Sequence, residues 1–441
     1  MRTNLRLIAP AGRTHEGGTA ARETAKQQLK RSVMTCLLWE DGFYEDGVEI
    51  ATRILDLARQ VSIPDLCAIA VDARHAMFLR HVPLLLSLAL IERGRGDAVT
   101  PEIRHQIVAT IASVLYRADE PGELISMYKA LGGKTIPRLM KQAINAALPK
   151  FNEYMLAKYS RRGDAVTTRD VLRICRPKPA NDEQSALWKG VVARTLATPD
   201  TWETALSSGA DKAATWRRLL RDKKLGGLAA LRNLRNMQQA GLSVAEISDG
   251  LRLCDYGYVL PFRFIAAARH APALEPVLEE LLFKKLEADR RGGGNTIILV
   301  DVSGSMDNPM SEKSDMRFID AACGVAMVGR ELFENVRVFS FSNALVEVAP
   351  RRGFALRDAI VQSQAHGGTY LGAAIAQLPP CDRLIVITDE QSADAARYNG
   401  HGFIVDVAAN QKGVSNGTLT RINGFSENIF RYIAEVEATR P

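Results

Sequence analysis

The chain has 441 residues, 57 Lys and Arg against 50 Asp and Glu, a formal net charge of +7, and 46% hydrophobic residues. This composition is typical of a globular protein and excludes a collagen-like, low-complexity or largely disordered chain. The longest uncharged apolar stretch, residues 82–91, is about half as long as a bilayer span, so we expect no transmembrane helix and no membrane partner. The N-terminus lacks the apolar run of a secretory signal, and the six cysteines form no Cys-x-x-Cys pair. These features favour a cytoplasmic protein without a zinc ribbon or a disulfide scaffold.

Residues 1–22 show no periodicity and are predicted to form a flexible N-terminal tail. From 23 to 290 nearly every segment has the apolar spacing of an amphipathic helix and ends at Gly or Pro. Residues 200–203 and 243–246 both have the form of a capping box at a helix start. Many short helices without intervening strands predict an α-helical HEAT-like repeat domain, a solenoid.

Positive charge is concentrated in this helical part. Residues 1–290 hold 43 Lys and Arg against 33 Asp and Glu, whereas residues 291–441 hold 14 against 17. The basic residues are densest at 158–178 and at 212–235. Such fields attract polyanions, but solvated helix faces produce the same pattern, so charge alone does not separate nucleic-acid binding from an ordinary surface.

After the glycines at 292–294 the pattern changes to short apolar runs rich in β-branched residues. We predict strands at 296–301, 336–341, 383–388 and 403–407, with helices at 316–332, 370–378, 391–398 and 426–437. This alternation predicts a doubly wound α/β domain over residues 295–441. Residues 346–349 lie too close to the preceding strand for a helical crossover, so they are expected to form an antiparallel edge strand.

The first of these strands ends in Asp301-Val-Ser303-Gly-Ser305, at the edge where open α/β sheets bind ligands. Carboxylate and hydroxyl oxygens are hard ligands that favour Mg²⁺. Thr369, before a predicted helix, and Asp389, after a predicted strand, could converge on the same edge. We therefore predict a site for Mg²⁺, or another divalent cation, formed by Asp301, Ser303, Ser305, Thr369 and Asp389.

These five residues match, position by position, the metal-ion-dependent adhesion site of von Willebrand factor A domains, and residues 296–441 resemble such a domain. The resemblance implies that one metal position stays open for an oxygen atom of a partner.

The helical part resembles the TROVE domain of the Ro ribonucleoprotein family, in a bacterial-type member. The resemblance is carried by residues 158–178, 200–209, 216–220, 228–237 and 260–264, and with the A domain it covers about residues 25–441. It implies that helical repeats close into a ring whose ends the A domain joins. It also implies binding of small Y-type noncoding RNA on a basic outer face and of single-stranded 3′ ends of misfolded or immature RNA in the central hole. Bacterial relatives partner exoribonucleases, and a ring that closes within one chain is expected to be monomeric.

The segment 158–178 reads as two helices joined by a turn, with Arg169, Arg173 and Arg176 along one face. Arginine pairs with phosphate and stacks on bases, which suits irregular RNA. Arg232 and Asn233 lie within an apolar stripe and are expected to be structural. The predicted RNA-binding residues of the two segments are Lys158, Arg161, Arg162, Arg169, Arg173, Arg176, Lys178, Arg217, Arg218, Arg221, Lys223 and Lys224.

No catalytic motif has the context that it requires. Gly413-Val-Ser415-Asn-Gly417 lacks the strand and helix of a nucleophile elbow, and two carboxylates are few for a metal-dependent nuclease. We therefore predict a non-catalytic RNA-binding scaffold that assists a nuclease in RNA quality control or decay. The alternative is a metal-dependent protein-interaction module on a helical scaffold without specific RNA binding, and a metal-dependent ribonuclease is a third hypothesis.

Overall fold

The computed structural model of the chain describes residues 24–34, 47–159, 165–207, 209, 211–287, 292–310, 316–389, 392–394, 396–400, 402–408, 419–423 and 428–438. The predicted tail at 1–22 lies outside these residues. Within them, no helix combines the length and the apolar character that crossing a membrane requires.

The first part of the chain is helical, as predicted. Two short 3-10 helices, η1 (Leu148–Lys150) and η2 (Pro272–Leu274), interrupt the α-helices. The α-helices are α1 (Ala25–Met34), α2 (Gly47–Gln60), α3 (Ile63–His75), α4 (His81–Arg93), α5 (Pro101–Val114), α6 (Glu120–Ala130), α7 (Arg138–Ala147), α8 (Glu153–Tyr159), α9 (Thr168–Cys175), α10 (Asp182–Ala193), α11 (Trp202–Ser207), α12 (Lys212–Arg221), α13 (Gly227–Arg232), α14 (Leu234–Gln239), α15 (Val244–Arg252), α16 (Phe262–His270) and α17 (Glu275–Glu287).

The two predicted capping boxes have different outcomes. Ser243 and Glu246 form the reciprocal hydrogen bonds of a capping box at the start of α15, as predicted. At the start of α11 the prediction is wrong, because Thr201 rather than Asp200 accepts the hydrogen bond, from the backbone N–H of Thr204. The Asp200 carboxylate is instead held by cations of α12, described below.

The second part of the chain forms a six-stranded sheet in the order β3-β2-β1-β4-β5-β6. Every neighbouring pair is parallel except β2 and β3, which confirms the predicted antiparallel edge strand. The elements are β1 (Asn295–Asp301), 3-10 helix η3 (Gly304–Asp307), α18 (Phe318–Leu332), β2 (Asn335–Phe341), β3 (Leu345–Glu347), α19 (Gly353–Val361), α20 (Leu371–Gln377), β4 (Arg383–Thr388), β5 (Gly402–Asp406), β6 (Thr420–Asn423) and α21 (Asn428–Ala438). The sequence patterns did not predict α19 or β6.

Alternating residues of the strands face two different cores, as a sheet covered on both sides requires. Ile297 and Leu299 of β1 pack with Leu371 and Ile375 of α20. Ile298 and Val300 belong instead to the large core that includes α18 and α21 and extends into the helical part. The sheet is thus fixed on one face to the body of the molecule.

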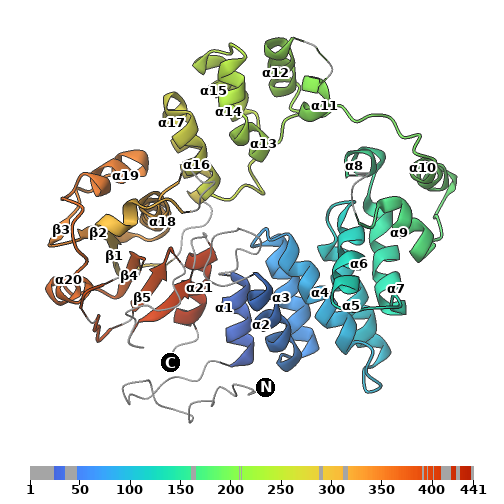
Figure 1. The fold of residues 1–441 in the computed structure, drawn as a ribbon, viewed down its shortest axis with the longest axis horizontal. Coiled ribbons are helices and arrows are strands. Elements are labelled where there is room, and N and C mark those ends of the chain that lie inside the picture. Colours follow the sequence, from blue (N-terminus) through green and yellow to red (C-terminus); the bar gives the residue numbers. More distant parts are fainter. Residues whose placement is uncertain are drawn as a thin grey trace, which may run out of the picture.

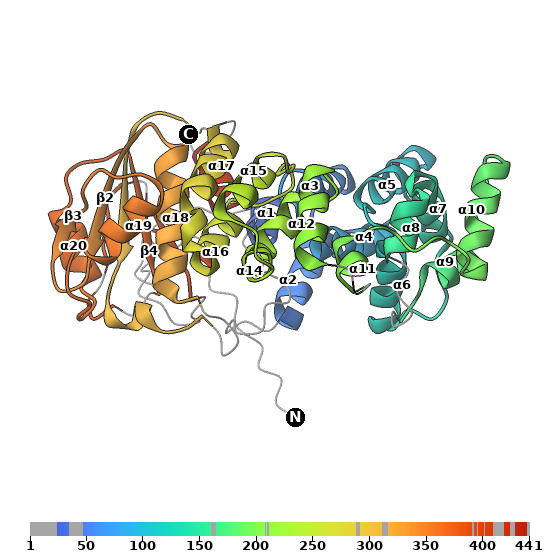
Figure 2. The ribbon, with the colours of Figure 1, turned by 90° about the horizontal axis from the view of Figure 1, so that it is seen from above.

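Helices α1–α17 follow an arc, and the sheet part lies between the two ends of this arc (Figure 1). At one end α16 and α17 pack on α18, where Arg269 pairs with Asp320, and Arg357 Nη1 of α19 lies 2.7 Å from Glu275 Oε1 of α17. Seen from above, the sheet part and α10 occupy opposite ends of the long axis (Figure 2).

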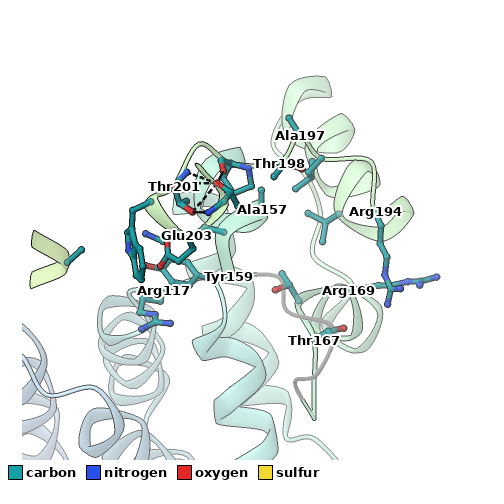
Figure 3. A pocket seen from close by; sticks show the side chains of 18 of the residues that line it. Arg117, Ala157, Tyr159, Thr167, Arg169, Arg194, Ala197, Thr198, Thr201 and Glu203 are labelled. Carbon is teal, nitrogen blue, oxygen red and sulfur yellow. Dashed lines mark hydrogen bonds between the residues drawn. The ribbon is translucent and has the colours of Figure 1, made fainter. Parts of the chain in front are cut away.

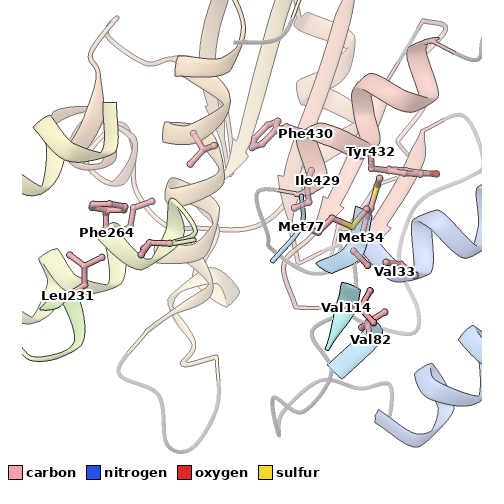
Figure 4. Packing of buried hydrophobic residues seen from close by; sticks show 14 of the residues in the cluster. Val33, Met34, Met77, Val82, Val114, Leu231, Phe264, Ile429, Phe430 and Tyr432 are labelled. Carbon is pink, nitrogen blue, oxygen red and sulfur yellow. The ribbon is translucent and has the colours of Figure 1, made fainter. Parts of the chain in front are cut away.

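At the other end of the arc α21 packs against α1, which is more than 390 residues earlier in the chain. Ile429 and Tyr432 of α21 lie among Val33, Met34 and Met77 in the apolar core (Figure 4). Lys30 of α1 also pairs with Glu435 of α21. The sheet part therefore contacts both ends of the helical arc and closes it.

Candidate nucleic-acid interface and metal site

The Asp301 carboxyl group, at the end of β1, is fully buried. Its Oδ1 accepts a hydrogen bond from the backbone N–H of Ser303 at 2.9 Å, and its Oδ2 accepts one from Thr388 Oγ1 at 2.5 Å. Burial raises the pKa of Asp301 to about 6, although the hydrogen bonds from Ser303 and Thr388 oppose this rise, and repulsion by Asp389 adds to it. A buried carboxylate beside a second acid is a position at which a divalent cation would offset the negative charge.

The remaining predicted ligands reach this edge from three loops. The hydroxyl oxygens of Ser303 and Ser305 lie 3.2 Å apart. The N–H of Gly304 donates to the carbonyl of Gly367 at 3.0 Å, which joins the first loop to the loop that carries Thr369. Asp389 follows β4, the strand paired with β1, and is buried, as is Thr369. The structure thus brings together the three segments predicted to form the metal site.

Two residues hold the loop after Asp389 against the start of α20. Asp394 accepts hydrogen bonds from the N–H groups of Gly372 and Ala373 at 2.8 and 2.7 Å, and Ser392 Oγ accepts one from Leu371 N–H. The Asp394 carboxyl is partly buried, which by itself would raise its pKa, but these backbone hydrogen bonds lower it. The helix predicted at 391–398 is wrong for the described residues of that range, because Ser and Asp side chains here bind backbone groups of another segment.

The donor set at this edge consists of two carboxylates and three hydroxyl groups. Among the described residues, no group of three or more His, Cys, Asp or Glu side chains has the arrangement of a metal site. A site rich in hydroxyl oxygen and poor in nitrogen and sulfur suits Mg²⁺ and does not suit Zn²⁺. The residues present therefore fit the predicted ion.

The described residues of the first basic segment include the end of α8 and the whole of α9, the two predicted helices, whereas residues 160–164 of the predicted turn lie outside the described residues. A capping box of Thr167 and Asp170 starts α9, which buries Val171, Leu172 and Cys175 and exposes Arg173. Arg176 does not continue the helical face, because it is the residue that ends α9 and has a left-handed backbone, with φ 48°. Arg161 and Arg162 lie outside the described residues. The cations Lys158, Arg169, Arg173, Arg176 and Lys178 form no ion pair with another described residue.

The second basic segment differs because acidic residues from other segments neutralise it. Arg218 and Lys224 both pair with Asp200, at 2.9 and 2.6 Å, and their hydrogen bonds hold the pKa of Asp200 well below its ordinary value. Arg217 pairs with Glu246 at 2.7 Å, and Arg221 with its neighbour Asp222 at 3.0 Å. Among the cations predicted here, Lys223 forms no ion pair with another described residue.

A pocket of about 1040 Å³ lies between α8, α9 and α10 on one side and α11 and α13 on the other. Figure 3 shows Arg117 and Tyr159 at one side of this pocket and Arg169 and Arg194 at the opposite side. The cations that line it are Arg117, Lys158, Arg169, Arg194 and Arg232, against a single acid, Glu203, among the described lining residues. This excess of positive charge, with threonine hydroxyls between the cations, suits a flexible polyanion.

Aromatic rings accompany these cations. The Arg117 guanidinium lies 4.3 Å from the ring centre of Tyr159, and Lys158 Nζ lies 5.6 Å from the same ring. Burial would lower the pKa of Arg117, but its hydrogen bond with Asp119 raises it above the ordinary value, so the cation persists at every physiological pH. Trp202 also lines the pocket and stacks on the buried Trp216, with ring centres 6.2 Å apart.

Sequence reasoning missed Arg117 and Arg194, and it interpreted Arg232 as structural. Arg117 lies 41 residues before Lys158, and no local pattern connects the two. Arg232 is exposed at the pocket, which corrects the expectation for this residue. Asn233 is 3% exposed and donates to the carbonyl of Ala229, which fits the structural role expected for it.

Comparisons with known proteins agree with this architecture. Residues 193–269 match the family model of the TROVE domain. The chain is similar to the crystal structure of the Deinococcus radiodurans Ro (Rsr) protein, with a TM-score of 0.66 and 16% sequence identity. The match covers 93% of this chain and 98% of that one. The chain has the Ro fold. Both findings confirm the resemblance that the sequence motifs indicate, and the TROVE segment supplies the wall of the pocket that carries Arg194, Trp202 and Arg232.

Proposed function

We propose that this chain is an RNA-binding scaffold of the Ro type. The observation that carries the proposal is the pocket between α8–α10 on one side and α11 and α13 on the other, which five cations and one acid line beside aromatic rings. Arg117 also pairs with Asp119, whereas Lys158, Arg169, Arg194 and Arg232 form no ion pair with another described residue. Arginine and lysine neutralise phosphates and release their counterions, whereas Tyr159 and Trp202 offer faces on which bases of any sequence can stack. The pocket would receive a single-stranded segment such as the 3′ end of a misfolded or immature RNA.

Cations of α9 and of the residues after it, which form no ion pair with another described residue, extend the basic surface beyond the pocket. Arg173, Arg176 and Lys178 are exposed and would contact the phosphates of a structured RNA, for which a small Y-type noncoding RNA is the proposed ligand. The fit to the TROVE family model and the Ro fold support this assignment. Within the proposal the protein is not an enzyme. It presents bound RNA to a separate exoribonuclease.

We also propose that the sheet part holds Mg²⁺ through Asp301, Ser303, Ser305, Thr369 and Asp389. The ion would supply an open coordination position for an oxygen atom of a protein partner. The chain's own residues bury Asp301, and Ser392 Oγ and the N–H of Ala393 donate hydrogen bonds to the carbonyl of Thr369. This favours the second function, metal-dependent capture of a protein partner, as an activity separate from RNA binding.

The test is equilibrium binding of the purified protein to a structured RNA with a single-stranded 3′ tail, titrated across salt concentrations. A matched RNA without the tail is the control ligand, and both titrations are repeated in EDTA. Because each contacted phosphate of a single strand contributes about −0.7 to the slope of log affinity against log salt, several contacts give a steep slope.

A steep slope, a preference for the tailed RNA and indifference to EDTA are the expected results. Equal, weak binding of both RNAs would overturn the RNA scaffold and leave metal-dependent capture of a protein as the main function. Cleavage of the RNA that EDTA abolishes would instead identify a nuclease.

A further inference from the structure

Three helices in the basic region end on a cation with a left-handed backbone. Among the described residues, four that are not glycine have a positive φ, and three of these are Arg176 at 48°, Arg194 at 62° and Lys223 at 53°. They follow α9, α10 and α12, respectively. Side chains with a Cβ rarely adopt this conformation, and Asn, Asp and His are the residues enriched in it, so three long cations require an explanation.

The hydrogen bonds show that these are ordinary helix-ending motifs with an unusual residue. After α10, Arg194 N–H donates to the Val191 carbonyl and Thr195 N–H to the Gly190 carbonyl, which is the Schellman pattern. Lys223 and Lys224 make the same two bonds to Leu220 and Leu219 after α12. Arg176 N–H makes the single bond of the related left-handed cap to Leu172, and Pro177 follows it.

Elsewhere in the same chain the same motif uses glycine. Gly132 ends α6 with φ 87°, and Gly241 ends α14 with φ 90°, both with the Schellman pair of hydrogen bonds. Glycine has no Cβ and adopts this conformation without strain. The cations at the ends of α9, α10 and α12 therefore replace the residue that best suits the backbone.

Attraction to the negative end of the helix dipole is the competing explanation. A cation in the last helical turn provides that attraction without backbone strain. Helix α9 already has Arg173 there, and α12 already has Arg218 and Arg221. The dipole thus gives little reason for a further strained cation after α9 or α12. Helix α10 has no basic residue in its last turn, so for Arg194 the argument rests on its position in the pocket.

The placement of the three side chains points to a ligand. All three are exposed, and none forms an ion pair with another described residue. Arg194 lines the pocket opposite Arg117, near Arg169 of α9 (Figure 3). Residues held in strained backbone conformations cluster at functional sites, where the surrounding structure fixes them.

We infer that Arg176, Arg194 and Lys223 are phosphate-binding residues that the chain retains for RNA at the expense of its own folding stability. Because the backbone leaves the helical path at a left-handed cap, each cationic side chain lies beyond the end of its helix. There it forms no ion pair with an acid among the described residues. This inference rests on the proposed RNA binding, and it assigns a phosphate contact to Arg194 of the pocket and to Arg176 and Lys223, which lie outside the pocket.

The experiment compares the single variants Arg176→Gly, Arg194→Gly and Lys223→Gly with the wild-type chain. We measure the midpoint of thermal unfolding and the salt dependence of affinity for the tailed RNA. Each variant is expected to unfold at the same or a higher temperature, while the salt slope falls in magnitude by about 0.7 because one phosphate contact is lost. Replacing a residue with a purely structural role would not both preserve the unfolding midpoint and reduce the salt slope.

Two controls separate charge from backbone strain. Arg351→Ala removes an exposed cation of the sheet part that has no ion pair with another described residue, and it should leave both the unfolding midpoint and the salt slope unchanged. Gly241→Arg places a cation on a left-handed cap whose Cβ would meet no atom within 4 Å, so a lower unfolding midpoint measures the backbone strain alone.

Lower unfolding midpoints for the three glycine variants, with unchanged RNA binding, would overturn the inference and make the cations structural caps. Wild-type binding with unchanged salt slopes in all three variants would also overturn it while leaving the proposed function intact. A wild-type chain that does not bind the RNA would overturn the proposed function and this inference together.

Discussion

The two basic segments of the helical part look alike in sequence and differ in the folded chain. In the first, α8 and α9 present cations that form no ion pair with another described residue, and two of them line the pocket. In the second, Asp200 holds Arg218 and Lys224, and Glu246 holds Arg217. Asp200 and Glu246 lie outside the run of basic residues, and among these paired acids only Asp222, the partner of Arg221, lies within it.

The difference shows that a dense run of cations in a sequence does not by itself determine the electrostatic potential at the protein surface. Exposed ion pairs are worth about 0–1 kcal/mol each, so a phosphate can displace them, but every displaced acid stays nearby and repels the incoming anion. The described cations of the first segment form no ion pair with another described residue, so a phosphate displaces no ion-paired acid there. The affinity for RNA should therefore depend strongly on the cations of α9 and weakly on those of α12.

The largest expected effect comes from reversing charge on α9. Replacing Arg169, Arg173 and Arg176 by Glu should weaken binding of the tailed RNA by roughly 100-fold, because three phosphate contacts become repulsive. Filter binding or fluorescence anisotropy at fixed salt measures the loss. The control for folding is the double variant in which only Arg173 and Arg176 become Glu. Both side chains are exposed, so these two changes should not disturb the packing of α9. Full retention of affinity in the triple variant would remove α9 from the interface.

Neutralising α12 should have a much smaller effect. With Arg217, Arg218 and Lys224 all changed to Gln, we expect affinity for the same RNA to fall by about threefold, because these cations are already compensated by acids. The same titration measures it, side by side with the α9 variant. A loss as large as that of the α9 variant would show that RNA displaces the ion pairs, and the comparison between the segments would fail.

Removing the acid that compensates α12 should act in the opposite direction. Asp200→Asn frees Arg218 and Lys224, so RNA affinity should rise by about twofold. Because the pKa of Asp200 lies below its ordinary value, its carboxylate stays charged at pH 6 and pH 8, and the ratio of variant to wild type should be equal at both. Asp249→Asn, which removes an exposed acid paired with Arg252 of α15, is the matched control. An unchanged affinity after Asp200→Asn would mean that α12 faces no RNA.

The smallest expected effect on RNA belongs to the sheet part. Asp301→Ala should leave RNA affinity unchanged, because the cations that line the pocket lie in the helical part. The same variant should abolish Mn²⁺ binding measured by electron paramagnetic resonance, because it removes a buried carboxylate of the proposed site. Asp382→Asn is the control, since Asp382 accepts a backbone hydrogen bond from Asn295 at the opposite edge of the sheet. A loss of RNA affinity in the Asp301→Ala variant would show that RNA binding depends on the proposed metal site.

Much of the fold was predictable because its signals are local. The β-branched run at 296–301 and the change of period after the glycines at 292–294 follow from how strands and helices bury apolar residues. The helix predicted at 391–398 failed because Ser392 and Asp394 bind the backbone of α20. That competition depends on a segment about 20 residues earlier, which a local pattern does not contain.

The candidate metal site was predictable for the same reason, since loops that follow parallel strands meet at one edge of a sheet. The proposed RNA interface was harder to predict from the sequence. Arg117 reaches the pocket from the turn before α6, and Asp200 neutralises α12 across 18 and 24 residues. The left-handed backbone of Arg194 has no sequence signature either, because the residue usual at such a position is glycine.

The contact between α1 and α21 sets the order in which the chain can be completed. During synthesis α1 is made long before α21, so the apolar surface formed by Val33, Met34 and Met77 stays uncovered while the intervening elements are made. Contacts between such distant segments form late, because the intervening chain must be ordered first. Translation therefore leaves an interval in which the helical arc exists but is not yet closed.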